Sequence, residues 1–165
     1  MTSVNPKWDR RFLRLAREVS GWSKDPSTRV GAVVVDPCSR NVLSIGYNGF
    51  PRRIADTEAR YMERSKKYAL MVHGEMNAIY NATSNGVSLR GGTIYVYGLC
   101  ICEQCALGII QVGIKRVVYF TPNPSSQDRW AKSTGTAKQH LEEAGVKLYS
   151  YSDIEVNEED KHYEL

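Results

Sequence analysis

Stretches typical of β-strands alternate with stretches typical of helices along most of this chain, and this alternation restricts its fold more than any other feature. Two runs rich in β-branched residues, 30–36 and 42–47, flank a short turn segment and predict a β-hairpin. After the hairpin, a helix separates each strand from the next, which requires crossover connections and favours parallel pairing. We therefore predict an α/β protein, a three-layer α/β/α sandwich around a five-stranded mixed sheet. The other expected elements are a first helix from Pro6 to Trp22, helices at 73–83, 102–112 and 137–144, and strands at 93–97, 115–120 and 146–149.

The length of 165 residues suits one domain with a single core. We expect that domain to cover residues 1–150, with a polar insertion or long loop at 49–72 and another loop at 121–134. The remaining residues, 151–165, form an acidic C-terminal tail, whose last 13 residues carry six Asp or Glu and one Lys. We expect the tail to be frayed or to depend on a partner.

The N-terminal segment and the clustered cysteines bear on whether the protein is secreted or stays in the cytoplasm. The first 20 residues are charged where a signal peptide needs an apolar run, and no segment approaches the ~20 apolar residues of a membrane span. We therefore expect a cytoplasmic protein with no membrane partner. Because thiols stay reduced in the cytosol, the bunching of Cys100, Cys102 and Cys105 favours metal binding over disulfides.

Two short motifs, HGE at residues 73–75 and CEQC at residues 102–105, contain the side chains best suited to catalysis. One imidazole and two thiolates are ligands that zinc prefers, and three protein ligands leave a fourth position open, as in catalytic zinc sites. Residues 73 and 75 would lie on opposite sides of a regular helix, so we expect both in a first turn that points end-on at the metal. The two cysteines would lie at the start of the next helix, where the N-terminus stabilises thiolates.

These residues predict a hydrolytic reaction. Zinc lowers the pKa of a bound water from ~15.7 to about 7, which makes hydroxide available at neutral pH. Glu75, which is not needed as a ligand, would take the water proton, deliver it to a ring nitrogen and help ammonia leave. The expected zinc ligands are His73, Cys102 and Cys105. Their spacing matches the H-x-E and C-x-x-C parts of the zinc deaminase signature.

Longer runs of the sequence resemble one known family. The chain is similar to the deoxycytidylate (dCMP) deaminases of the zinc-dependent cytidine deaminase superfamily over roughly residues 5–148. The matching runs are SKDPSTRVGAVVVD, GYNGFPR, KKYALMVHGEMNAI, the C-x-x-C-A run, GIKRVVYF, DRW and EEAGV. This resemblance implies hydrolysis of dCMP to dUMP and ammonia by a zinc-bound hydroxide, a step that feeds dTTP synthesis.

The resemblance also implies roles for particular residues and an assembly. His73, Cys102 and Cys105 would hold Zn²⁺ and Glu75 would transfer protons. Three further residues would contact the substrate: Asn48 the nucleoside, and Arg29 and Tyr119 the nucleotide or its phosphate. Members of the family suggest a homohexamer that dCTP activates and dTTP inhibits, with Mg²⁺ accompanying these allosteric nucleotides.

Two positions depart from the family pattern. Gly74 stands where the family usually has alanine, and Ile101 stands where a proline usually precedes the first cysteine. We expect both positions to line the base pocket, so the substrate could instead be a modified dCMP, dCTP or an adenine nucleotide.

A third hypothesis is a nucleic-acid-binding module with a structural zinc, closed by Cys100 or Cys38 as the fourth ligand. Such a module would bind nucleic acid tightly and in a salt-dependent way, without turnover. The net charge of +4 is small for that role. His140 and His162 are expected at the surface, and Trp130 fits either the site or the core.

Overall fold

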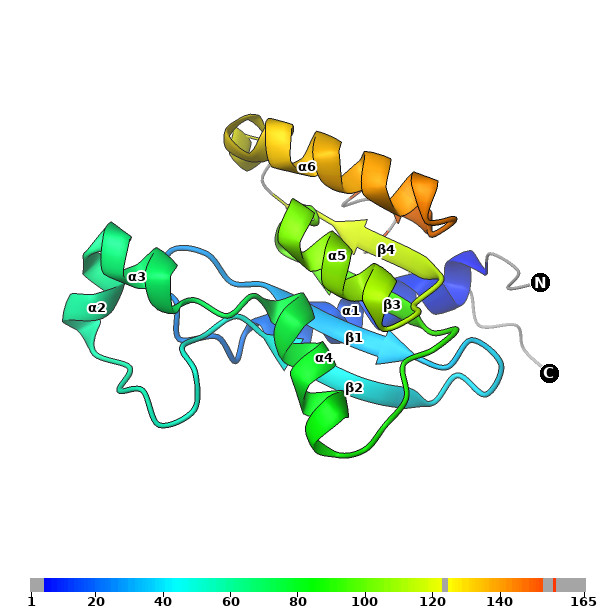
Figure 1. Cartoon of the computed structure of the whole chain (residues 1–165), viewed down its shortest axis with the longest axis horizontal. Helices are drawn as coiled ribbons and strands as arrows, with labels where there is room; N and C mark the ends of the chain where they lie inside the picture. Colours follow the sequence, from blue (N-terminus) through cyan, green and yellow to red (C-terminus); the bar gives the residue numbers. More distant parts are fainter. Residues whose placement is uncertain (1–4, 123–124, 153–155, 157–165) are drawn as a thin grey trace, which may run out of the picture.

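The computed structural model describes residues 5–122, 125–152 and 156, with the backbone alone described for 125–130. Helices cover both faces of a central sheet (Figure 1). Within the described residues, no helix is long and apolar enough to cross a membrane. The helices are α1 (Pro6–Ser20), α2 (Glu58–Met62), α3 (Arg64–Leu70), α4 (Gly74–Ser84), α5 (Glu103–Gln111) and α6 (Ser125–Glu143).

The five strands form one mixed sheet in the order β2-β1-β3-β4-β5. The strand β1 pairs antiparallel with both β2 and β3, whereas β3, β4 and β5 run parallel to one another. This sheet confirms the predicted fold class. The strands are β1 (Gly31–Val35), β2 (Val42–Tyr47), β3 (Thr93–Tyr97), β4 (Arg116–Phe120) and β5 (Lys147–Ser150).

Alternating residues of the central strands pack in two apolar clusters, one on each face of the sheet. In β1, Ala32 and Val34 pack with the cluster that includes residues of α4, α5 and α6, whereas Val33 and Val35 pack with the cluster that includes α1. Side chains on a strand point to opposite faces with a period of two, so a strand buried on both faces has no polar positions. This is why β1 is an unbroken apolar run, GAVVV.

A buried ion pair joins the first helix to strand β4 on the face of the sheet that this helix covers. Asp9 of α1 is 1% exposed and accepts hydrogen bonds from both terminal nitrogens of Arg116, at 2.7 and 2.5 Å. The hydroxyls of Tyr95 and Tyr151 also donate to its carboxylate, at 2.9 and 2.7 Å. The Arg116 guanidinium lies 4.6 Å from the ring centroid of Tyr149. Asp9 is therefore fully paired, as a buried carboxylate must be.

The C-terminal segment takes part in this core as far as it is described. Val156 is 1% exposed and belongs to the cluster on the α1 face, and its carbonyl oxygen accepts a hydrogen bond from Arg14. Together with the Tyr151 contact to Asp9, this extends the packed domain beyond the boundary expected at residue 150. The rest of the predicted acidic tail lies outside the described residues, as does His162.

Two segments expected as loops contain helices. The expected loop at 121–134 is wrong from Ser125 onward, because α6 begins there rather than near Ala137. Prolines and serines suggested a loop, but prolines just before a helix and serine at its start are also common signals of a helix N-terminus. The insertion at 49–72 carries the short helices α2 and α3, in agreement with its partly helical pattern.

Candidate active site

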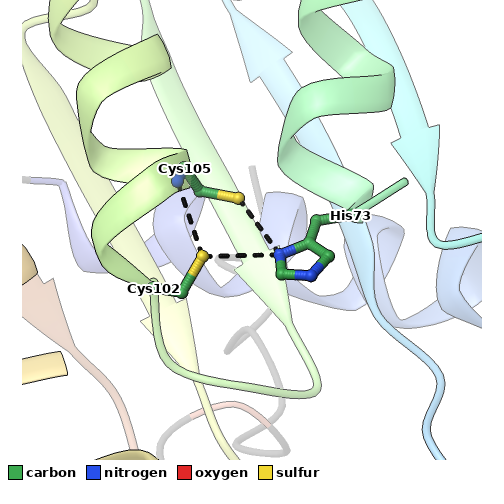
Figure 2. Close-up of side chains that lie close together, drawn as sticks. All are labelled: His73, Cys102 and Cys105. Carbon is green, nitrogen blue, oxygen red and sulfur yellow. Dashed lines mark hydrogen bonds between the residues drawn. The ribbon is translucent and has the colours of Figure 1, made fainter. Parts of the chain in front are cut away.

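The N-termini of α4 and α5 lie next to each other and place the predicted ligands together (Figure 2). His73 is the N-cap residue of α4, and Glu75 lies in the first turn of that helix. Cys102 is the N-cap residue of α5, and its sulfur accepts a hydrogen bond from the backbone N–H of Cys105. The expected end-on approach of two helix N-termini is therefore what the backbone adopts.

The distances among the three side chains fit a zinc ion. The Nδ1 atom of His73 lies 3.4 Å from the sulfur of Cys102 and 3.4 Å from that of Cys105, and Figure 2 shows this nitrogen turned toward both sulfurs. All three ligand atoms lie within 4.8 Å of one another. In a tetrahedral zinc site the nitrogen–sulfur separation is about 3.5 Å, given Zn–N and Zn–S bonds of roughly 2.0 and 2.3 Å. The donor set and its spacing thus suit zinc.

The other two cysteines do not join this group. Cys38 is exposed in the turn between β1 and β2. Cys100 is buried, and its sulfur lies 2.9 Å from the hydroxyl oxygen of Thr134 in α6. Within the part of the chain that the structure describes, the metal-ligating group contains only His73, Cys102 and Cys105. The described residues therefore supply three ligands rather than four.

Hydrogen bonding within the group shifts the pKa values of the two thiols in opposite directions. A hydrogen bond from Cys105, together with one from His73, lowers the pKa of Cys102 to about 4 despite burial. The same hydrogen bond to Cys102, and burial, raise the pKa of Cys105. The hydrogen bond with Cys102 also raises the pKa of His73.

Glu75 is buried beside this group. Its side chain is 3% exposed, and burial raises its pKa above the usual range. The nearby His73 opposes that rise, and Cys105 contributes a hydrogen bond. Glu75 lines the same pocket as His73 and Cys102, a cavity of about 580 Å³. A carboxyl group with this position and a raised pKa is suited to exchanging protons near neutral pH.

Of the two departures from the family pattern, only Gly74 lines the pocket. A methyl group on Gly74 would lie 3.1 Å from the carbonyl oxygen of Val30 and 3.3 Å from its side chain. The glycine thus lets the start of α4 approach the chain just before β1. Ile101 is 2% exposed and packs in the apolar cluster, so the expectation that it lines the pocket is wrong.

The three predicted substrate contacts lie in different surroundings. Asn48 is 5% exposed and lines the pocket, but its amide is occupied by the backbone: the oxygen accepts from the N–H of Val30, and the nitrogen donates to the carbonyl of Thr28. Arg29 is exposed and does not line the pocket. Tyr119 is half-buried on β4 and does not line it either. Asn48 therefore shapes the pocket wall, while substrate contact by these three residues stays a prediction.

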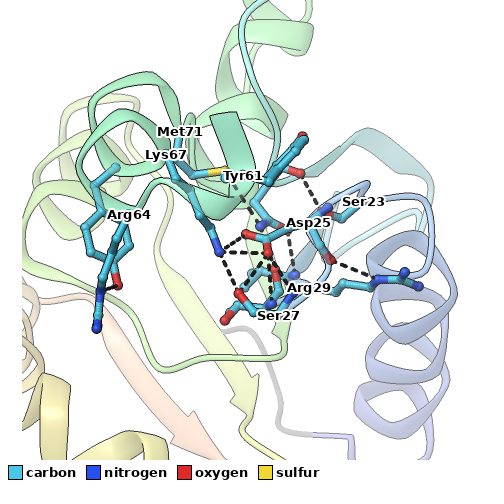
Figure 3. A network of polar contacts seen from close by, with 12 residues as sticks. Ser23, Asp25, Ser27, Arg29, Tyr61, Arg64, Lys67 and Met71 are labelled. Atoms are coloured by element: carbon cyan, nitrogen blue, oxygen red, sulfur yellow. Dashed lines mark hydrogen bonds and ion pairs between the residues drawn. The ribbon is translucent and has the colours of Figure 1, made fainter. Parts of the chain in front are cut away.

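Sequence reasoning missed a polar network at the opposite end of the pocket (Figure 3). Asp25, 1% exposed, forms an ion pair with Lys67 of α3 and accepts hydrogen bonds from the backbone N–H groups of Ser27 and Thr28. The pair joins the loop before β1 to the insertion across 42 positions of sequence. No local pattern signals such a pair, although Asp25 and Lys67 both lie in runs that resemble the family.

This network predicts a specific acid sensitivity. Burial alone would raise the pKa of Asp25, but hydrogen bonds from Lys67, Ser27 and Thr28 outweigh it and hold the pKa below its usual value. A carboxyl group with a lower pKa in the folded state adds stability above its unfolded pKa of about 3.9, and that stability is lost as the pH falls through the folded pKa. Between pH 5 and 2, we expect the free energy of unfolding, measured in urea, to fall less steeply in Asp25→Asn. An equal slope in the two proteins would contradict this role.

His140 and Trp130 complete the predicted positions. His140 lies in the last turn of α6, is half-buried rather than at the surface, and is not among the grouped ligands. The side chain of Trp130 lies outside the described part of the structure.

Comparison with known proteins agrees with this site. Residues 6–121 match the family described as the cytidine and deoxycytidylate deaminase zinc-binding region. An uncharacterised deaminase of Aliivibrio fischeri is 37% identical over 142 residues, covering 86% of this chain and 92% of the relative. A probable deoxycytidylate deaminase of Drosophila melanogaster is 38% identical over 149 residues, covering 84% and 70%.

Human deoxycytidylate deaminase is 33% identical over 127 residues, covering 74% of this chain and 69% of the human protein. The crystal structure of the dCMP deaminase from cyanophage S-TIM5, in complex with dCMP and dUMP, has the same fold. Its TM-score is 0.70 at 21% identity, covering 90% of this chain and 100% of the phage chain. The resemblance seen in the sequence is confirmed: this chain belongs to the cytidine and deoxycytidylate deaminase family, and to its deoxycytidylate branch.

Proposed function

We propose that the protein hydrolyses dCMP to dUMP and ammonia. The observation that carries this proposal is the grouping of His73, Cys102 and Cys105 beside the buried Glu75, at one end of a pocket of about 580 Å³. Pockets of this size take ligands as large as a nucleotide. The relatives named as deoxycytidylate deaminases support dCMP as the substrate. In that role the protein would feed dTTP synthesis.

The protein's own residues divide the work. His73, Cys102 and Cys105 would hold zinc, which, when bound, lowers the pKa of water to about 7 and supplies the attacking hydroxide. Glu75 takes the proton of that water and passes it to N3 of the cytosine ring. Glu75 then takes the proton of the hydroxyl group newly added at C4 and passes it to the exocyclic amino group, so that ammonia leaves from C4 as the carbonyl of uracil forms. Water is consumed, and no oxidant or reductant is required.

The test of this proposal is ammonia release from dCMP by the zinc-loaded protein, with dUMP identified as the product. We expect turnover that a chelator abolishes and added Zn²⁺ restores. If dCMP gives no ammonia, a panel containing modified dCMP, dCTP and an adenine nucleotide decides whether another base is the substrate. If no member of that panel releases ammonia and the protein binds nucleic acid in a salt-dependent way, the nucleic-acid-binding module with a structural zinc would be favoured instead.

Loss of one ligand should remove the metal. We expect Cys105→Ala to lose its zinc and its activity, because two remaining ligands cannot hold the ion in a catalytic site. Cys38→Ala is the matched control, since this thiol is exposed in a turn away from the ligand group. Zinc content by elemental analysis checks both variants. One stoichiometric zinc in Cys105→Ala would show that a different thiol binds the metal.

Assembly and regulation are separate proposals that rest on the family resemblance. We expect a homohexamer in sedimentation experiments, activation by dCTP with Mg²⁺, and inhibition by dTTP. A monomer whose rate responds to neither nucleotide would contradict both expectations.

A further inference from the structure

The pocket of the candidate site has a second end, formed by the insertion. His73, Glu75 and Cys102 line one end, whereas α3 and the loop at residues 25–28 line the other. The acidic, basic and histidine side chains on the pocket wall are Asp25, Arg64, Lys67, His73 and Glu75. The site where the base would react is therefore joined, within one cavity, to a region with two cationic side chains.

One of these cations, Lys67, is already neutralised. Its amino group donates to both carboxylate oxygens of Asp25, at 2.8 and 2.7 Å, and to the hydroxyl of Ser27 at 2.6 Å. An ammonium group has three donors, so these contacts use all of them. Lys67 is also 8% exposed. It fixes α3 to the loop before β1 and leaves no charge for a ligand.

The other cation, Arg64, is held in place but is not neutralised. Its Nε atom donates to the hydroxyl of Tyr68 at 3.0 Å, and its guanidinium lies 5.3 Å from the Tyr68 ring centroid. Neither terminal nitrogen has a partner among the described residues. The neighbouring Glu63 is paired with Lys66 instead. Figure 3 shows Arg64 on α3, apart from the network around Asp25.

We propose that Arg64 binds the 5′-phosphate of the substrate and makes the site selective for nucleotides over nucleosides. This inference rests on the proposed function and adds the residue that binds the phosphate of the substrate. A guanidinium presents a planar pair of N–H groups that matches two phosphate oxygens, and Tyr68 orients it through a bond to the remaining N–H. The proposed phosphate contact is thus Arg64 in the insertion, which lines the pocket, rather than Arg29, which does not.

Kinetics on a matched pair of substrates tests the proposal. We expect Arg64→Ala to lower kcat/KM for dCMP about 10- to 100-fold, mainly through KM, because a charge-assisted hydrogen bond that is equal in the ground and transition states is lost. Activity on deoxycytidine, which lacks the phosphate, should not change. Arg64→Lys should recover part of the loss on dCMP. Lys66→Ala, which removes an exposed cation from the same helix outside this pocket, should match the unmodified protein on both substrates.

The outcomes separate this proposal from the proposed function. An equal loss on dCMP and deoxycytidine, or no loss on either, would overturn the role of Arg64 while leaving the deaminase intact. Equal activity of the unmodified protein on both substrates would do the same. If the unmodified protein deaminates neither, the proposed function fails, and calorimetry with dUMP and deoxyuridine decides the role of Arg64. Tighter binding of dUMP that Arg64→Ala abolishes would support it, and equal binding of the two would overturn it.

Discussion

Replacing Glu75 with glutamine should reduce kcat for dCMP between about 10²- and 10⁴-fold, the usual contribution of a general acid–base group. The amide has nearly the same shape as the carboxylate but can neither take a proton from water nor pass one to the cytosine ring. Glu75 is not among the three grouped ligands, so the variant should keep one zinc per chain. It should also remain folded, because a neutral side chain is less costly than a carboxylate in this buried position.

Steady-state kinetics and zinc analysis on the same preparations check this expectation. The matched control is Glu103→Gln, which removes a carboxylate from the first turn of the adjoining helix α5, outside the pocket lining. That control should keep near-normal turnover. Near-normal turnover by Glu75→Gln would remove Glu75 from proton transfer, and loss of its zinc would make it a residue that supports the metal site.

Removing the carboxylate of Asp9 should cost about 3–5 kcal/mol of unfolding free energy, the usual effect of breaking a buried ion pair from one side. Asp9→Ala would leave the guanidinium of Arg116 charged in a position where it is 4% exposed, with two tyrosine hydroxyls also losing their acceptor. Urea unfolding followed by circular dichroism measures the loss. Glu18→Gln, an exposed change on the same helix, should alter stability by less than ~0.5 kcal/mol.

A double variant distinguishes the unpaired charge from the loss of packing. Asp9→Leu with Arg116→Met leaves no buried charge, so we expect it to be more stable than Asp9→Ala alone. If the double variant were equally unstable, the cost would come from the shape of the cavity and the tyrosine hydroxyls rather than from the stranded cation. Zinc content should be the same in all of these proteins, because Asp9 lies outside the pocket of the metal site.

Local patterns in the sequence were sufficient to place the strands and the two helix starts that carry the candidate metal ligands. The β-branched runs correspond to β1 and β2, and each of the residues at 73, 75, 102 and 105 lies at a helix start whose position a short motif reveals. Strands and helix starts depend on residues within a few positions along the chain. That is why periodicity and spacing can predict them.

Contacts between distant segments had no comparable signal. The pairing of Asp25 with Lys67 and of Asp9 with Arg116 depends on the tertiary fold, since 42 and 107 positions separate the partners. The amide of Asn48, expected to contact the substrate, hydrogen-bonds to the backbone of Val30 and Thr28, 18 and 20 positions away, and its contact with the substrate stays a prediction. The start of α6 was missed because proline and serine are favoured both in turns and at helix starts.

The wide separation between α1 and its partners has a consequence for how the chain reaches this fold in a cell. The helix is synthesised before the other elements, yet Asp9 can pair only after Arg116 and Tyr151 have been added. Arg14 likewise contacts the carbonyl of Val156, 142 positions later. At 5–20 residues per second, a ribosome needs about 7 to 30 s to add the residues from Asp9 to Val156. During that interval the apolar face of α1 has no finished sheet to cover it, so it is a surface that a chaperone on the nascent chain would meet early.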